Sequence, residues 1–195
     1  MKRDGGAAMS EIKYSQYDLI NKELKELDER GFANRFVNFI LTDRRLPFKV
    51  KVPTDLFQRA EILCEDVVEM KENNKAFTQA ELIEYIFKEF LEEVRKNDGN
   101  LRSFQMKFNN RMKDLPMING QPLLPQKRKT TLHTKIGRKE VRRAEVFLQD
   151  LSFLSNHDLT VEKLLEMLYI DFLNEYQQGR RKKVLKVILE AIDQP

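Results

Sequence analysis

The chain carries one structural plan twice, at residues 48–91 and again at residues 132–173. In each copy a short stretch of alternating apolar and polar residues precedes an amphipathic helical pattern, a loop and a second apolar helical pattern. A shift of 84 positions superposes the alternating stretches and the first helical patterns, so that Glu61 falls on Glu145. A shift of 82 positions superposes the second helical patterns. Such a repeat indicates two copies of one unit packed about a pseudo-twofold axis.

The alternating stretches predict two strands, over 48–52 and 131–136, because successive side chains of a strand point to opposite faces. One short strand is not stable alone, so we expect the two to pair antiparallel as a two-stranded ribbon. The face toward the helices would hold Phe48, Val50, Val52, Leu132, Thr134 and Ile136. Of these Thr134 is the one polar side chain, which would weaken its side of the ribbon. The outward face would hold Lys49, Lys51, Thr131, His133 and Lys135.

The rest of the sequence predicts a mainly α-helical chain, because its apolar residues recur at helical spacing. Helices are predicted over 10–29, 32–41, 55–72, 79–96, 101–113, 138–154, 161–176 and 180–192, with Thr54, Thr78 and Thr160 capping three of them. The chain then divides into an N-terminal helical extension (1–43), a first repeat (44–96), a connector (97–126), a second repeat (127–177) and a C-terminal helix (178–195).

Positive charge is concentrated in the second half of the chain, although the net charge is only +4. Residues 99–195 hold 18 basic and 11 acidic side chains, whereas residues 44–98 hold 10 and 12. Residues 127–143 alone hold eight Lys or Arg against one acid, Glu140. Such a block is suited to phosphate groups, and a solvated linker is the alternative reading.

Several functional classes lack support in the sequence. The single cysteine, Cys64, lies on an apolar helical stripe and is interpreted as a buried structural thiol. His133 and His157 have no ligand spacing around them that fits a metal, and no phosphate-binding loop or nucleophile–base pattern is evident, so we expect neither a cofactor nor an enzyme. No apolar run is long enough to span a membrane and no secretory leader is visible, so we expect a cytoplasmic protein.

This arrangement resembles the ribbon-helix-helix family of DNA-binding proteins, which includes the Arc and methionine repressors. The resemblance covers residues 48–94 and 132–176, as two units fused in one chain. Members of the family insert paired strands into the major groove of DNA. The resemblance implies that the base-reading side chains are Lys49, Lys51, Thr131, His133 and Lys135. It also implies that phosphates are held at the start of each second helix, by Thr78 and Gln79 in one copy and by Thr160 and Val161 in the other.

Further phosphate contacts are expected from the basic residues near the second strand. These are Lys127, Arg128, Lys129, Arg138, Lys139 and Arg142, with Arg143 beside them. The corresponding first-repeat residues 54, 55, 58 and 59 are much less basic. We therefore expect the two repeats to bind DNA with unequal strength. The role would be that of a transcriptional repressor, or of a partition or relaxosome accessory factor of a plasmid or mobile element. The alternative is a helical scaffold for protein partners without DNA binding, and the N- or C-terminal helices could mediate self-association.

Overall fold

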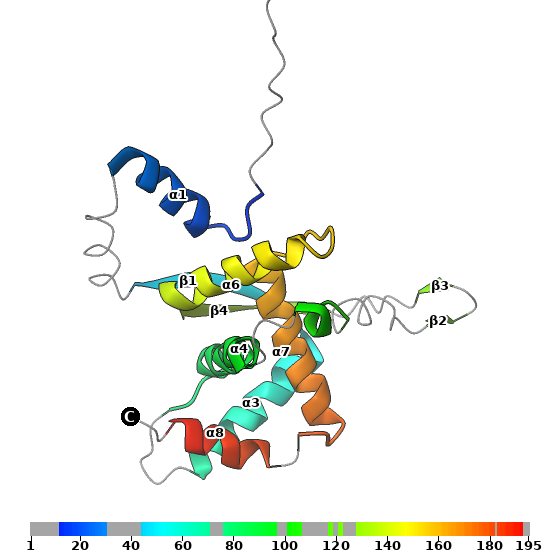
Figure 1. Ribbon diagram of the computed structural model, residues 1–195. Coiled ribbons are helices and arrows are strands. Elements are labelled where there is room, and N and C mark those ends of the chain that lie inside the picture. Colours follow the sequence, from blue (N-terminus) through cyan, green and yellow to red (C-terminus); the bar gives the residue numbers. More distant parts are fainter. Residues whose placement is uncertain are drawn as a thin grey trace, which may run out of the picture.

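The computed structural model describes residues 12–30, 44–70, 76–96, 101–106, 117–118, 121–122, 128–181 and 183–192. As predicted, the protein is mainly helical with a small antiparallel ribbon, formed by β1 (Arg45–Pro53) and β4 (Lys129–Gly137) (Figure 1). The helices are α1 (Leu19–Arg30), α3 (Thr54–Glu69), α4 (Gln79–Lys96), α6 (Arg138–Ser152), α7 (Val161–Gln177) and α8 (Val184–Ile192), and residues 101–106 are also helical. Two very short strands, β2 (Met117–Ile118) and β3 (Gln121–Pro122), pair in the connector. The predicted helix at 32–41 and residues 107–113 of the predicted connector helix lie outside the described residues.

The ribbon pairs the two segments that the repeat singles out. Lys49 lies opposite His133, and because these residues are also 84 positions apart, the local twofold axis of the ribbon passes through this pair. The two strands have the same alternation of exposed and buried residues. The strands are longer than predicted, and Arg45 and Pro47 therefore join the outward face.

Both ends of the ribbon are closed in the same way. The backbone N–H of Thr54 donates to the carbonyl of Arg128 (2.9 Å), and that of Arg138 donates to the carbonyl of Arg44 (2.9 Å). These two bonds are related by the 84-residue shift. The prediction that Thr54 caps α3 is wrong: the cap residue is Pro53, and the Thr54 hydroxyl donates instead to the Arg128 carbonyl (2.8 Å).

The inward face of the ribbon is covered by α4 and α7. The side chains of Val50, Val52 and Ile136 have no exposed surface, and burial of this apolar area is the main force that holds the ribbon on the helices. Thr134 is buried as well, and its hydroxyl donates to the carbonyl of Ala80 (3.1 Å). This bond satisfies the hydroxyl and ties β4 to the first turn of α4, so a polar residue is tolerated on the inner face.

The N-terminal part of the chain differs from the predicted helix over 10–29. Residues 14–20 are called here the N-terminal segment. Residues 14–18 are not helical, and α1 begins at Leu19. The Glu145 carboxylate on α6 explains this start, because it accepts hydrogen bonds from the Ser15 hydroxyl and from the amides of Leu19 (3.1 Å) and Ile20 (2.9 Å). The first amides of a helix lack partners within the helix, so a distant carboxylate caps α1.

Replacing Glu145 with alanine should lower the free energy of unfolding by about 3 kcal/mol, because it leaves buried amide donors of α1 without acceptors. Urea unfolding measures the loss, and faster trypsin cleavage at Lys13 would report release of the segment. The matched control is Glu61→Ala, which changes the equivalent but exposed residue of the first repeat and should leave stability nearly unchanged. Equal effects of the two substitutions would contradict the capping role.

The C-terminal helix α8 packs against α3, at the opposite end of the molecule from α1 (Figure 1). Two residues of its apolar stripe, Val184 and Ile188, are buried within the chain, whereas Val187 is 45% exposed. Before α8, Arg181 forms an ion pair with Glu175 (2.8 Å) and lies over the ring of Phe172 at 4.4 Å. Part of the apolar stripe that suggested self-association through this helix is therefore used inside the molecule.

Candidate nucleic-acid interface

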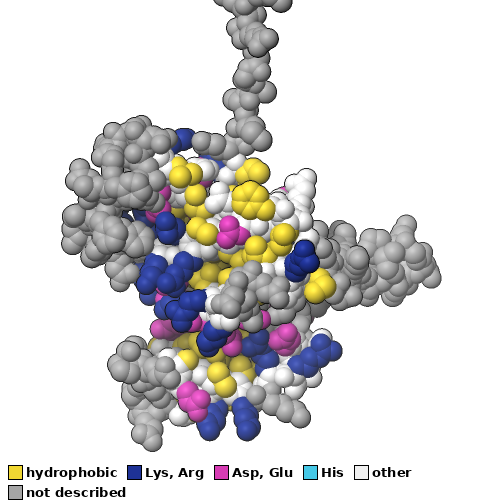
Figure 2. Space-filling model, in the orientation of Figure 1, with side chains coloured by type: hydrophobic (Ala, Val, Ile, Leu, Met, Phe, Trp, Pro, Cys, Tyr) yellow, Lys and Arg dark blue, Asp and Glu magenta, His cyan; other side chains and the backbone are white. Residues whose placement is uncertain are grey.

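The outward face of the ribbon carries the predicted base-reading side chains. Lys49, Lys51, Thr131, His133 and Lys135 are all exposed. The register brings Lys51 opposite Thr131 and Lys135 opposite Pro47, on either side of the central pair of Lys49 and His133. Figure 2 has the orientation of Figure 1, and it shows Lys and Arg side chains gathered in the region where Figure 1 shows β1 and β4. A two-stranded ribbon with such a face matches the width of the DNA major groove.

A cation stands at each end of the ribbon and pairs with the helix beneath it. Arg45 forms an ion pair with Glu84 of α4, and its guanidinium also donates to the carbonyl of Lys135 (2.8 Å). Lys129 forms the equivalent ion pair with Glu166 of α7 (3.2 Å). Sequence reasoning missed Arg45, although the 84-residue shift places it on Lys129 and could have found it. Both cations help to hold the ribbon on the helices.

The basic residues around the start of α6 fall into two groups. Arg128 and Lys139 are exposed and Arg138 is partly exposed. By contrast, Arg142 donates through Nε to Glu23 of α1 (2.6 Å), and Glu23 is itself buried. Arg142 therefore anchors α1, and this pairing weighs against the expected phosphate contact. Lys127 lies outside the described residues.

The starts of α4 and α7 differ from simple phosphate clamps. The amide of Val161 donates to the carbonyl of Tyr14 (2.7 Å), so the N-terminal segment occupies this helix start. The Gln79 side chain is buried, where it donates to the carbonyl of Phe57 (3.1 Å) and accepts from the Tyr169 hydroxyl (2.8 Å). The Val161 amide and the Gln79 side chain are therefore not available to a phosphate in this arrangement, which weighs against a clamp made by these two groups. Sequence alone could not separate a buried glutamine from an exposed one at this position.

The two threonine caps are formed as predicted. The Thr78 amide donates to Glu81 (2.7 Å) and the Glu81 amide donates to the Thr78 hydroxyl (3.3 Å), which is a complete capping box. The Thr160 hydroxyl accepts from the amide of Lys163 (3.4 Å). Both hydroxyls are used within their own helix starts, so the threonines stabilise α4 and α7 and are weak candidates for DNA contacts.

The thiol of Cys64 is buried on α3, as expected. Burial, with the nearby carboxylates of Glu81, Glu61 and Glu65, raises the pKa of Cys64 to about 12. At about pH 8 the thiolate fraction should be on the order of 1,000-fold smaller in the native protein than in the unfolded chain. We therefore expect Ellman's reagent to react at least that much more slowly with the native protein than in urea. Comparable rates in the two conditions would show that the thiol is accessible and not shifted.

Among the described residues, no group of three or more His, Cys, Asp and Glu side chains could hold a metal ion. Within the same part of the chain, each helix is too short or too polar to cross a bilayer. No protein-family model matches this chain, and neither a curated protein nor a solved structure is significantly similar to it.

Proposed function

We propose that this protein binds double-stranded DNA by placing the β1–β4 ribbon in the major groove, with two ribbon-helix-helix units fused in one chain. The proposal rests on the side chains of the outward face of the ribbon. Its outward positions alternate along both strands and hold five Lys or Arg and no acidic residue. These positions are Arg45, Pro47, Lys49, Lys51, Pro53, Lys129, Thr131, His133, Lys135 and Gly137.

The outward side chains have complementary roles in the proposal. Lysines donate to the guanine acceptors of the major groove, and Thr131 can contact either a base edge or a thymine methyl group. The paired strands support these side chains on a base that is fixed by the core, which keeps their positions defined when they meet DNA. Four of the five cations are lysines, so part of the affinity comes from phosphates and is independent of sequence.

Phosphate contacts in the proposal come from the ribbon ends and from the start of α6. Arg128 and Lys139 are exposed there, whereas the equivalent first-repeat residues are Arg44 and the acidic Asp55. The second repeat should therefore hold the DNA backbone more strongly, and the footprint should be asymmetric about the ribbon centre. The biological role that fits such binding is transcriptional repression, or an accessory role in partition or transfer of a plasmid or mobile element.

The test is binding to duplex DNA selected from a random pool, followed by the salt dependence of the affinity. Neutralising about five phosphates predicts a slope of about −4.5 in log K against log salt, or a loss of about 500-fold between about 50 and 200 mM salt. A protein-interaction scaffold without DNA binding would select no sequence from the pool. That result would exclude the proposal.

A further inference from the structure

The N-terminal segment lies in a groove of the second repeat that is bounded by α6, the start of α7 and β1. Three of the bonds that hold it there are made by residues 14–16. The Tyr14 carbonyl accepts from Val161 (2.7 Å), the Gln16 amide donates to Glu162 (3.0 Å), and the Ser15 hydroxyl donates to Glu145.

Aromatic contacts complete the docking of this segment. The ring of Tyr17 meets the ring of Phe48 edge to face, with centroids 5.3 Å apart, and its hydroxyl donates to the carbonyl of Pro47. Tyr14 is buried, and its hydroxyl donates to Ser152 of α6 (3.1 Å). The groove thus recognises an aromatic residue, a hydroxyl and the first turn of a helix.

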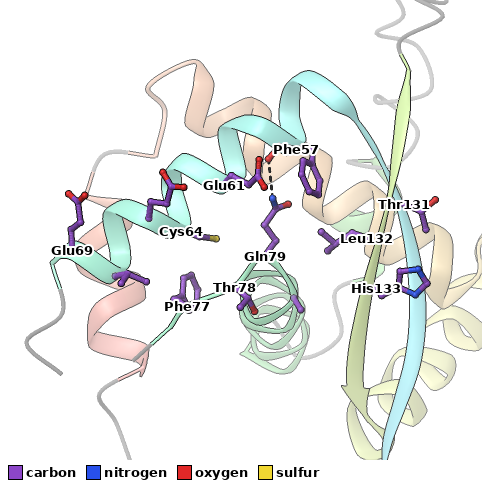
Figure 3. Close-up of a pocket in the computed structure, with 13 residues that line it drawn as sticks. Phe57, Glu61, Cys64, Glu69, Phe77, Thr78, Gln79, Thr131, Leu132 and His133 are labelled. Atoms are coloured by element: carbon purple, nitrogen blue, oxygen red, sulfur yellow. Dashed lines mark hydrogen bonds between the residues drawn. The ribbon is translucent and has the colours of Figure 1, made fainter. Parts of the chain in front are cut away.

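The first repeat contains the same groove, and there it is an open cavity of about 690 Å³ between α3, the start of α4 and β4 (Figure 3). The repeat shifts relate the two sets of walls position by position. Glu61 corresponds to Glu145, and Leu132 of β4 corresponds to Phe48 of β1. At the helix start Gln79 corresponds to Val161, so its backbone N–H matches the one that bonds Tyr14.

The exposed fractions of equivalent residues differ as expected if the second-repeat groove is occupied and the first-repeat groove is open. Glu145 is 1% exposed beneath the N-terminal segment, whereas Glu61 is exposed at the cavity. Phe48 is 1% exposed beneath Tyr17, whereas Leu132 is 9% exposed. Apolar and acidic residues line the cavity together, among them Phe57, Val68, Phe77, Glu65 and Glu69. Its volume is within the range of about 300–1,000 Å³ that is typical of ligand pockets.

We propose that this cavity docks a segment of a partner protein built like the N-terminal segment: an aromatic residue followed by a hydroxyl and the first turn of a helix. The partner's carbonyl would accept from the Gln79 amide, and its first helical amides would donate to Glu61. The acidic rim favours this occupant, because a helix N-terminus carries partial positive charge. The N-terminal segment already fills the second-repeat groove, and no other described residue fills the first-repeat cavity. We therefore assign the occupant to another polypeptide. This inference does not depend on DNA binding.

The experiment uses the full chain and a fluorescent synthetic peptide of residues 12–30 as the probe. Anisotropy should show saturable binding, and Glu61→Ala should weaken it about tenfold, because it removes a charged acceptor. The matched control is Glu92→Ala, which changes a carboxylate of α4 that pairs with Arg95 and does not line the cavity. This control should bind like the unmodified protein.

A gain of binding provides a second test that does not depend on loss of structure. Glu162, which accepts from Gln16, corresponds to Ala80 in the first repeat. Ala80→Glu should therefore tighten peptide binding about tenfold by supplying the missing acceptor. The proposal is overturned if the peptide does not bind up to about millimolar concentration, or if binding is lost in Glu145→Ala and not in Glu61→Ala. It is also overturned if the intact chain dimerises through this groove, since the occupant would then be a second copy.

Discussion

The combined substitution of Lys49, Lys51, Thr131 and Lys135 by alanine should abolish preference for the selected DNA sequence while the fold is retained. All four side chains are exposed on the outward face of the ribbon, so their truncation creates no cavity. Each well-formed base contact contributes about 1–3 kcal/mol of discrimination. Loss of several contacts should therefore reduce specific binding to the level of nonspecific binding, a change of about 1,000-fold or more.

The measurement is a comparison of affinities for the selected duplex and for a scrambled duplex, at one salt concentration. A matched control removes the same kind of charge away from the ribbon, by alanine substitution of Arg95 and Lys186, which form ion pairs on α4 and α8. The control should keep the full ratio between the affinities for the selected and the scrambled duplex. An unchanged ratio in the ribbon variant would show that the ribbon does not read the bases.

Val50→Asp should lower the free energy of unfolding by about 4 kcal/mol or more, because it places a carboxylate where no surface is exposed and no partner is provided. For a chain of this size the expected fall in melting temperature is about 12 °C. Burial raises the pKa of the new carboxyl group above its unfolded value. The loss should therefore be larger at about pH 8 than at about pH 4, where the group is protonated in the native state and about half protonated in the unfolded chain.

The control for this substitution is the next residue on the same strand. Lys51 is exposed, so Lys51→Asp adds the same carboxylate to the outward face and should change stability by less than about 0.5 kcal/mol. Thermal unfolding followed by circular dichroism measures both variants. If Val50→Asp had the same melting temperature as Lys51→Asp, the inward orientation of Val50 would be refuted.

The ribbon and the helices of the repeats could be predicted because regular hydrophobic periods specify them. Alternation placed Val50 and Leu132 on the inner face, and the repeat indicated which two strands pair, as the observed register confirms. The capping box at Thr78 and the burial of Cys64 could also be predicted, because each depends on neighbours along its own helix. Strand ends were less well predicted: the ladder extends to Arg45 and Lys129, whose side chains pair with helices distant in the sequence.

The parts that the sequence did not predict depend on single contacts between distant residues. Glu145 determines where α1 begins, although 125 positions separate it from Ile20. Gln79 lies at a helix start that suggests a phosphate contact, but Tyr169 and Phe57 draw its side chain into the core. No local pattern encodes such partners.

The distance along the chain between the two ribbon strands has a consequence for biosynthesis. His133 follows its partner Lys49 by 84 residues, so β1 leaves the ribosome long before β4 exists. At about 5–20 residues per second this interval lasts about 4–17 s. During that time β1 is an unpaired edge with Phe48, Val50 and Val52 uncovered, and such an edge is prone to aggregation. Slower translation of the connector should therefore lower the yield of native protein, and a chaperone that shields nascent strands should restore it.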